Sequence, residues 1–169
     1  MYDAYAGVVL VYGLRRLASR EDAEDAVIDV FTVIWRRLED VPDQPLPWIL
    51  GVARRVVATQ LRSERSRSFL VEKLMKISVG GREAQPGPAP GISGDVLRAL
   101  QELREWEREA LLLIHWEGLS NREAARVMEC AVPLFTLRVH RARRRLARAL
   151  DPPVTTPLLG HEAISEEGT

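Results

Sequence analysis

The sequence is short of cysteine, has no long apolar run and carries no net charge, and each lack excludes a class of protein. Cys130 is the single cysteine among 169 residues, so an intrachain disulfide and a cysteine cluster for zinc are both excluded. No stretch reaches the roughly 18 consecutive apolar residues of a membrane span. The first residues also lack the layout of a signal peptide. We therefore expect a cytoplasmic protein without membrane insertion.

The net charge is zero because 24 basic residues balance 24 acidic ones, but the two kinds are segregated. Residues 1–50 carry nine acids and five bases, whereas residues 51–70 carry five arginines and one acid. Residues 138–150 carry six arginines and no acid, and residues 151–169 carry four acids and no base. Such blocks usually face different partners. Plain solvated helix faces are the alternative.

The apolar residues recur at helical spacing, and no segment alternates as a strand would. The clearest stripe has the spacing of one buried helix face and comprises Ala23, Ala26, Val27, Val30, Phe31, Ile34, Trp35 and Leu38. Three prolines between Val41 and Pro47 then forbid a continuing helix. A new helix is predicted from about Trp48 to Arg65. The fold class is therefore all-α.

The chain is predicted to form two small helical domains joined by a flexible linker. Residues 70–94 form the linker, because they are rich in glycine and proline. They should separate two independently packed units, an N-terminal helical bundle at residues 1–69 and a helix-turn-helix domain at residues 95–150. Residues 151–169 are interpreted as a disordered acidic tail.

The second domain contains a helix-turn-helix pattern. Ser120 and Glu123 predict a capping box at the start of a short helix that ends near Met128, and a long helix follows from about Val132. That helix should bury one face, formed by Val132, Phe135, Val139, Ala142 and Leu146. The second helix of such a pair fits the DNA major groove, and arginines bind guanine or phosphate at two points. A helical hairpin with a solvated basic face is the alternative.

Two surfaces of the first domain carry further signals. Acids lie opposite the apolar stripe, with Ile28 beside them, and apolar residues next to a charged face suit a protein interface. Acids in a first helical turn are also favourable by themselves, which explains Asp22 equally well. The helix after Trp48 joins an aromatic residue to arginines, a combination that binds opened strands. Trp48 itself is more simply a core anchor.

Five segments in order carry a family resemblance. They are Tyr2–Tyr5, Asp22–Trp35, Pro47–Arg54, Glu109–Ser120 and His140–Leu146. Together they resemble the sigma factors of the extracytoplasmic-function group of bacterial RNA polymerase. The resemblance covers both domains and leaves out the linker and the tail.

The resemblance implies a sigma factor that binds core RNA polymerase, through its largest and second-largest subunits, and directs promoter-specific transcription initiation. It implies no catalytic residue, no cofactor and no metal, and it adds an anti-sigma protein as a further partner. The helix from Asp22 to Trp35 would dock on the clamp of the largest subunit. The implied polymerase-binding residues are Asp22, Asp25, Ile28, Asp29 and Thr32.

The resemblance also assigns two sets of promoter DNA contacts. Residues Leu38 to Gln44 would form a pocket for a base flipped out of the duplex near the start site. The residues near that downstream element are Arg54, Arg55, Gln60, Arg62 and Arg65. The helix-turn-helix would read the upstream element through Asn121, Arg122, Pro133, Thr136, Leu137, Arg138, Arg141 and Arg144.

The second helix of the helix-turn-helix departs from the family's usual pattern. Ala131 cannot cap this helix as serine would, at a cost of about 1 kcal/mol. Pro133 fits only the first turn. Thr136 and Leu137 stand where a lysine and a serine would face DNA, so base reading is in question while phosphate binding is expected to persist.

Three other classes of function are alternatives to the sigma factor. A stand-alone helix-turn-helix regulator would bind duplex DNA without polymerase, usually as a dimer. A decoy would bind polymerase or an anti-sigma protein with weakened DNA reading. The three histidines and Cys130 form no catalytic or metal-binding constellation, so an enzyme is not expected.

Overall fold

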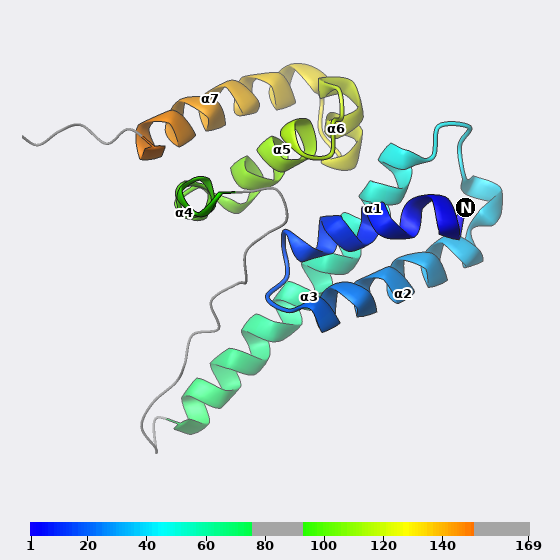
Figure 1. Cartoon of the computed structure of the whole chain (residues 1–169), viewed down its shortest axis with the longest axis horizontal. Helices are drawn as coiled ribbons and strands as arrows, with labels where there is room; N and C mark the ends of the chain where they lie inside the picture. The colour runs from blue at the N-terminus through cyan, green and yellow to red at the C-terminus, as the bar shows by residue number, and fades with distance from the viewer. Residues whose placement is uncertain (76–92, 151–169) are drawn as a thin grey trace, which may run out of the picture.

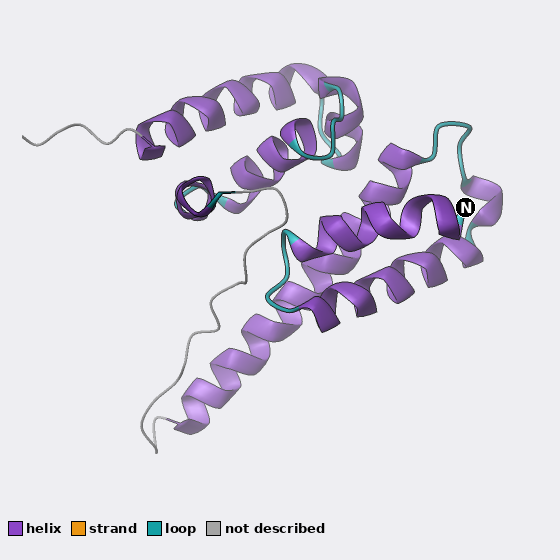
Figure 2. Cartoon of the chain, viewed as in Figure 1, coloured by secondary structure: helices purple, strands orange, loops and turns teal. Residues whose placement is uncertain are grey.

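The computed structural model describes residues 1–75 and 93–150, and within these ranges it contains seven α-helices and no strand (Figures 1 and 2). The all-α prediction is confirmed. The helices are α1 (Tyr2–Leu14), α2 (Arg20–Arg36), α3 (Leu46–Met75), α4 (Gly94–Gln101), α5 (Glu105–His115), α6 (Asn121–Val127) and α7 (Val132–Leu150), with a 3₁₀ turn at Leu38–Asp40. None of the helices in the described ranges is both long and apolar enough to cross a bilayer.

Helices α1, α2 and α3 form an N-terminal group around a shared apolar core. The buried face of α2 consists of Ala23, Ala26, Val27, Val30 and Ile34. The α1–α2 crossing is close because Gly13 lies directly against Ala23: a Cβ at Gly13 would stand 3.1 Å from the Ala23 Cβ. A hydrogen bond from the Asp22 backbone N–H to the Ser19 hydroxyl, at 3.0 Å, caps the start of α2.

The buried face of α2 is narrower than the sequence predicts. Trp35 is 76% exposed and Leu38 is 47% exposed, so placing them on the buried stripe was wrong. Each residue of an α-helix turns the side chain by about 100°. Trp35 directly follows the fully buried Ile34 and therefore points away from the core. Leu38 lies beyond the end of α2, in the 3₁₀ turn.

Helix α3 is longer than predicted in both directions. It begins at Leu46, two residues before Trp48, and continues to Met75, ten residues past Arg65. The helix therefore extends into the predicted linker, since the sequence offers no glycine or proline between Gly51 and Gly80 to end it. Most of the predicted linker and the acidic tail lie outside the described residues.

Helices α4 to α7 form a C-terminal group that contains the predicted helix-turn-helix. The Ser120–Glu123 capping box is confirmed at the start of α6. Gly118 adopts φ +69°, a left-handed conformation that glycine tolerates, in the turn between α5 and α6. Helix α7 buries Phe135, Val139 and Ala142. Val132 is 39% exposed, so its predicted burial was wrong: it stands at the open first turn of α7.

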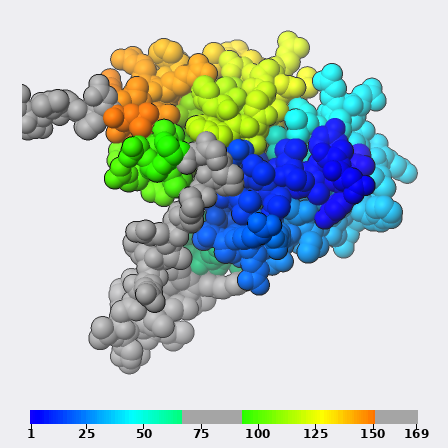
Figure 3. Space-filling model, viewed as in Figure 1, coloured from blue at the N-terminus to red at the C-terminus, as the bar shows by residue number. Residues whose placement is uncertain are grey.

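The two groups pack against each other, with α3 in contact with α6 (Figures 1 and 3). Their buried apolar residues belong to one cluster that includes Val57 of α3 and Leu112 of α5. In this conformation the two groups are therefore in contact, and ion pairs as well as apolar residues join them.

Candidate protein and nucleic-acid interfaces

An ionic cluster, defined here as Tyr12, Arg15, Arg16, Glu109 and Glu117, joins the two groups. The Tyr12 hydroxyl and the Arg16 Nε each donate to the Glu109 carboxylate at 2.7 Å. The Nη1 atoms of Arg15 and Arg16 both donate to the Glu117 carboxylate at 3.1 Å. The side chains of Arg16 and Glu117 are only 6% and 3% exposed, so the cluster is largely closed to water.

Burial and neighbouring charges set the protonation of two members of this ionic cluster, Tyr12 and Arg16. Burial raises the pKa of the Tyr12 phenol well above 10.0, so the hydroxyl stays protonated and donates. Burial by itself would lower the pKa of Arg16. The charge of Glu109 and the contact with Tyr12 raise it by more than burial lowers it, so the net shift of the Arg16 pKa is upward. The Arg16 guanidinium also lies 3.4 Å from the centre of the Tyr12 ring, a cation–π contact. The Arg16 guanidinium therefore stays charged and the Tyr12 hydroxyl stays neutral over the whole physiological pH range.

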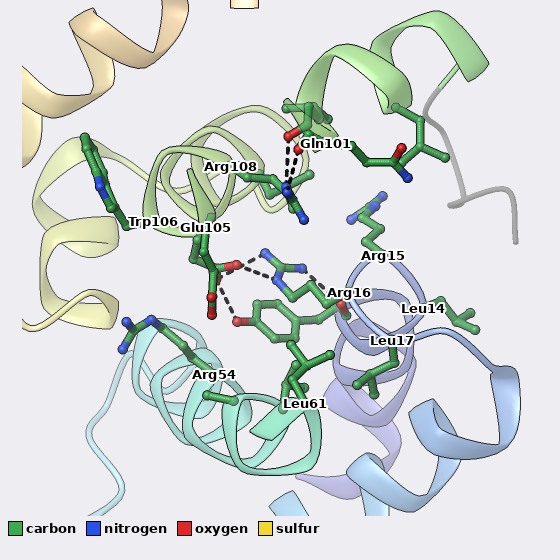
Figure 4. A pocket seen from close by; sticks show the side chains of 17 residues that line it. Leu14, Arg15, Arg16, Leu17, Arg54, Leu61, Gln101, Glu105, Trp106 and Arg108 are labelled. Atoms are coloured by element: carbon green, nitrogen blue, oxygen red, sulfur yellow. Dashed lines mark hydrogen bonds and ion pairs between the residues drawn. The ribbon is translucent and has the colours of Figure 1, made fainter. Parts of the chain in front are cut away.

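A hollow of about 380 Å³ lies beside the ionic cluster, between the two groups. Side chains from α1 and the turn after it, and from α3, α4 and α5, surround it, among them Arg16, Arg54 and Glu105 (Figure 4). The sequence did not predict this interface. The pairing of Arg16 with Glu109 spans 93 residues, and neither residue type signals a distant partner.

The predicted downstream-element residues on α3 lie mostly at this interface. Arg55 forms an ion pair with Glu129, in the turn after α6, and Arg65 pairs with Glu105 at 3.4 Å. Arg54 is half-buried and lines the hollow. The hydrogen bond from Arg55, together with its charge, lowers the pKa of the Glu129 carboxyl. In this conformation, acids of the C-terminal group occupy arginines that were predicted to bind DNA.

Two other predicted residues on α3 are placed differently. Arg62 is exposed and donates to the Thr59 hydroxyl at 3.3 Å. Gln60 is half-buried, and its Oε1 is enclosed without a hydrogen-bond partner among the described residues. An inward-turned amide is a poor contact for a duplex edge, so Gln60 departs from its predicted orientation.

A second hollow, of about 370 Å³, lies next to the proline-rich turn. Pro42, Gln44 and Trp48 line it from the N-terminal group, while Arg126 and Glu129 line it from the C-terminal group. Trp48 is half-buried against the core, close to its predicted role as an anchor. Pro42 and Gln44 of the predicted base pocket, Leu38 to Gln44, thus line one side of this hollow. Residues of α6 and of the turn after it line the opposite side.

The predicted polymerase-binding residues all lie on α2, and all except Asp22 are exposed to solvent. We call Asp25, Ile28, Asp29 and Thr32 the α2 ridge, and all four are exposed. The Thr32 hydroxyl donates to the Ile28 carbonyl at 2.8 Å, and neither carboxylate of the ridge has a partner among the described residues.

Two residues change the prediction at the α2 surface. Asp22 is half-buried, and its carboxylate accepts a hydrogen bond from the Ser19 hydroxyl, so helix capping accounts for it. Trp35, which sequence reasoning placed in the core, instead adds an aromatic ring to the exposed surface near the ridge. Its spacing of seven residues from Ile28 was the available signal.

The predicted upstream-reading residues are grouped on α6 and α7. Arg122, Pro133, Leu137, Arg141 and Arg144 are exposed. Their neighbours Asn121 and Thr136 are exposed as well, and the Asn121 Nδ2 donates to the Thr136 hydroxyl at 3.4 Å.

Arg138 and Leu134 differ from the prediction on α7. Arg138 was expected to face outward, but it is half-buried, with its guanidinium 5.2 Å from the Trp106 ring centre. Leu134 is 42% exposed beside Leu137 and was missed, although their spacing of three residues places them on one face.

Comparison with protein families assigns both groups. Residues 1–67 match the family described as Sigma-70 region 2, and residues 93–146 match Sigma-70, region 4. The two matches cover the N-terminal and C-terminal groups respectively.

Individual relatives agree with this assignment. The chain is 31% identical over 157 residues to the RNA polymerase sigma factor CnrH of Cupriavidus metallidurans, covering 86% of this chain and 82% of that one. It is 28% identical to the ECF RNA polymerase sigma factor BldN of Streptomyces coelicolor, covering 89% of this chain and 59% of that one.

A solved structure shares the arrangement of helices. The sigma factor RpoE of Bartonella quintana, in complex with the anti-sigma factor NepR, matches with a TM-score of 0.67 and 25% identity. The match covers 90% of this chain and 95% of that one. With both regions matched and a relative of 31% identity matched over 82% of its length, the chain belongs to the RNA polymerase sigma factors of the extracytoplasmic-function group.

Proposed function

We propose that this sigma factor divides its work among three surfaces: the α2 ridge docks on core polymerase, α3 acts at the opened promoter, and the helix-turn-helix reads the upstream element. The chain binds core RNA polymerase and directs promoter-specific initiation, as its family does. The proposal concerns which residues do so. We also propose that it catalyses nothing itself and acts in the cytoplasm, where the polymerase is.

The exposed surface of α2 is the observation that carries the docking proposal. Ile28 is 62% exposed between two carboxylates that have no partner in the part of the chain that the structure describes, and Trp35 is exposed nearby. Large apolar side chains held in water beside charges are typical of protein interfaces. The α2 ridge takes no part in the ion pairs that join the two groups, so it stays accessible in this conformation.

The arginines support two separate DNA contacts. Arg141 and Arg144 are exposed on α7 and can bind phosphates as the structure stands. Arg55 and Arg65 are paired with acids of the C-terminal group. We infer that these two reach DNA only after the groups separate, since a phosphate must replace Glu129 and Glu105.

An anti-sigma protein is a further proposed partner. The solved RpoE relative is in complex with an anti-sigma factor. CnrH, in complex with the cytosolic domain of CnrY, matches at a TM-score of 0.61 and 24% identity. We propose that this chain also has such an antagonist.

Charge reversal on the α2 ridge tests the docking proposal. The double variant Asp25→Arg, Asp29→Arg should bind core polymerase at least tenfold more weakly than the wild type in a pull-down titration, because it repels any basic surface that the ridge meets. Glu102→Arg, the same reversal at an exposed acid of the C-terminal group, should bind normally and serves as the control. Equal affinities for all three chains would contradict the docking role.

A gel shift with and without core polymerase separates the remaining alternatives. A sigma factor selects promoter duplex only in the presence of core. Specific binding by the free chain would favour a stand-alone regulator, and binding to core without promoter selection would favour a decoy.

A further inference from the structure

The exposed start of α7 is apolar where a DNA-reading helix usually carries hydrogen-bonding side chains. Leu134 is 42% exposed and Leu137 is 47% exposed, and Pro133 is exposed beside them. We call these three residues the α7 tip. We propose that the α7 tip reads thymine, with Leu134 and Leu137 in contact with thymine 5-methyl groups in the major groove of the upstream promoter element.

The two leucines of the α7 tip lie on the same face of α7 as two of its arginines. Phe135, Val139 and Ala142 face the core. With 3.6 residues per turn, Leu134, Leu137, Arg141 and Arg144 follow one another along the opposite, solvent-facing side. The leucines occupy the first turns of that line and the arginines the later ones. A duplex bound by the arginines through its phosphates therefore meets the leucines at its base edges.

Among residues 132–137 of α7, Thr136 has the one polar side chain, and its hydroxyl proton is already donated within the helix. The Thr136 hydroxyl donates to the Val132 carbonyl at 3.0 Å and accepts from Asn121 at 3.4 Å. Among the major-groove edges of the four bases, thymine is the one that offers an apolar group, its 5-methyl. Leucine side chains in that groove gain free energy from contact with this methyl and gain none from a donor or an acceptor.

Charge favours DNA over a protein as the occupant of the α7 tip. Helix α7 carries six arginines and no acid. Arg138 is half-buried against Trp106, which leaves Arg141 and Arg144 as the exposed cations nearest to the leucines along their face. A polyanion with apolar groups in its groove satisfies both features at once. The inference rests on the proposed role of the helix-turn-helix as the upstream reader.

Replacing thymidine by deoxyuridine tests the inference directly, because the two nucleosides differ only by the 5-methyl group. The reconstituted holoenzyme first selects duplexes from a library randomised in the upstream element. The selected duplex is then synthesised with deoxyuridine at each thymine in turn. We expect binding to weaken about fourfold at each contacted thymine, the effect of one apolar group of this size. Deoxyuridine outside the element should have no effect.

Protein variants complete the test. In the double variant Leu134→Ser, Leu137→Ser, deoxyuridine should cause no further loss, because the methyl no longer has an apolar partner. Leu150→Ser changes a leucine of the same helix that is 45% exposed, and it should retain the full deoxyuridine effect. Circular dichroism of the free chains should show equal helix content, since all three leucines are exposed.

Each contrary result has a distinct meaning. A selected element without thymine, or wild-type binding indifferent to deoxyuridine, would overturn the inference. Normal duplex binding by the double serine variant would overturn it too, and a loss of core binding by that variant would assign the α7 tip to a protein. A holoenzyme that selects no upstream element would refute the reading role itself, and the inference with it.

Discussion

At the scale of single residues, the start of the helix-turn-helix depends on Ser120 and Glu123. The Ser120 hydroxyl donates to the Glu123 carboxylate at 2.6 Å, and the Ser120 backbone N–H donates to it at 2.8 Å. These bonds lower the pKa of Glu123 below its usual 4.5. A lowered pKa in the folded state means that the ionised carboxylate adds stability above pH 4.5 and that this contribution is lost as the pH falls through the folded value.

Replacing Ser120 by alanine should lower the free energy of unfolding by about 1 kcal/mol at pH 7. The deficit should shrink as the pH falls through the folded pKa of Glu123, because protonation of Glu123 weakens the hydroxyl–carboxylate bond in the wild type. Urea unfolding at a series of pH values below 7 measures the deficit. Ser63→Ala, at an exposed serine of α3, is the matched control. A deficit that stays constant at every pH would contradict an ionised capping box.

The capping box was predictable from sequence because its two partners lie three residues apart. Trp35 shows the opposite case. Its ring is apolar and Trp35 directly follows a buried residue, Ile34. Which of two adjacent residues is buried depends on where α1 and α3 contact α2. Leu134 was overlooked for a similar reason, since solvent exposure of an apolar residue is a property of the packed helix.

At the scale of helices, the closeness of α1 and α2 depends on a glycine. A Cβ at Gly13 would lie 3.1 Å from the Ala23 Cβ, whereas a Cβ at Gly7 would meet nothing within 4 Å. Gly7→Leu should therefore raise the free energy of unfolding by about 0.5–1 kcal/mol through helix propensity. Gly13→Leu should lower it by about 1–3 kcal/mol by overpacking. Urea unfolding compares the two variants, and equal shifts would contradict the close crossing.

The helix boundaries could be predicted where the sequence supplies a signal. The prolines before Pro47 and the capping serine at Ser120 fix where α3 and α6 begin to within two residues. The end of α3 could not be fixed, because residues 66–75 contain neither a breaker nor a capping motif. The start of α7 at Val132 was predicted correctly.

At the scale of the whole molecule, the ionic cluster holds the two groups together. The Arg16 side chain is almost completely buried and pairs with two carboxylates, those of Glu109 and Glu117. Glu109→Ala removes the acceptor of both Tyr12 and the Arg16 Nε, and it leaves Glu117 as the remaining carboxylate partner of Arg16. Removing one partner of a buried ion pair costs up to about 3–5 kcal/mol. We expect the variant to respond by separating the groups.

Small-angle X-ray scattering should show a larger radius of gyration for Glu109→Ala than for the wild type. Circular dichroism should show the same helix content, because each group keeps its own apolar core. Glu102→Ala, at an exposed acid of the same group, is the control and should stay compact. An unchanged radius of gyration for Glu109→Ala would show that the ion pairs do not hold the closed arrangement.

The contact between the groups could not be read from the sequence. Charge segregation indicated different partners for the acidic and basic blocks, but it did not reveal that Arg55 and Arg65 pair with acids of this same chain. The predicted DNA contacts and the observed ion pairs compete for the same side chains. This competition is a property of the folded chain and has no local signature.

The chain should give core RNA polymerase its promoter choice, and transcription in vitro from genomic DNA with mapped start sites measures that choice. Defined start sites should appear when the chain is added to core polymerase. They should be lost with the Asp25→Arg, Asp29→Arg variant and be absent with core alone. Start sites that are the same with and without the chain would contradict this expectation.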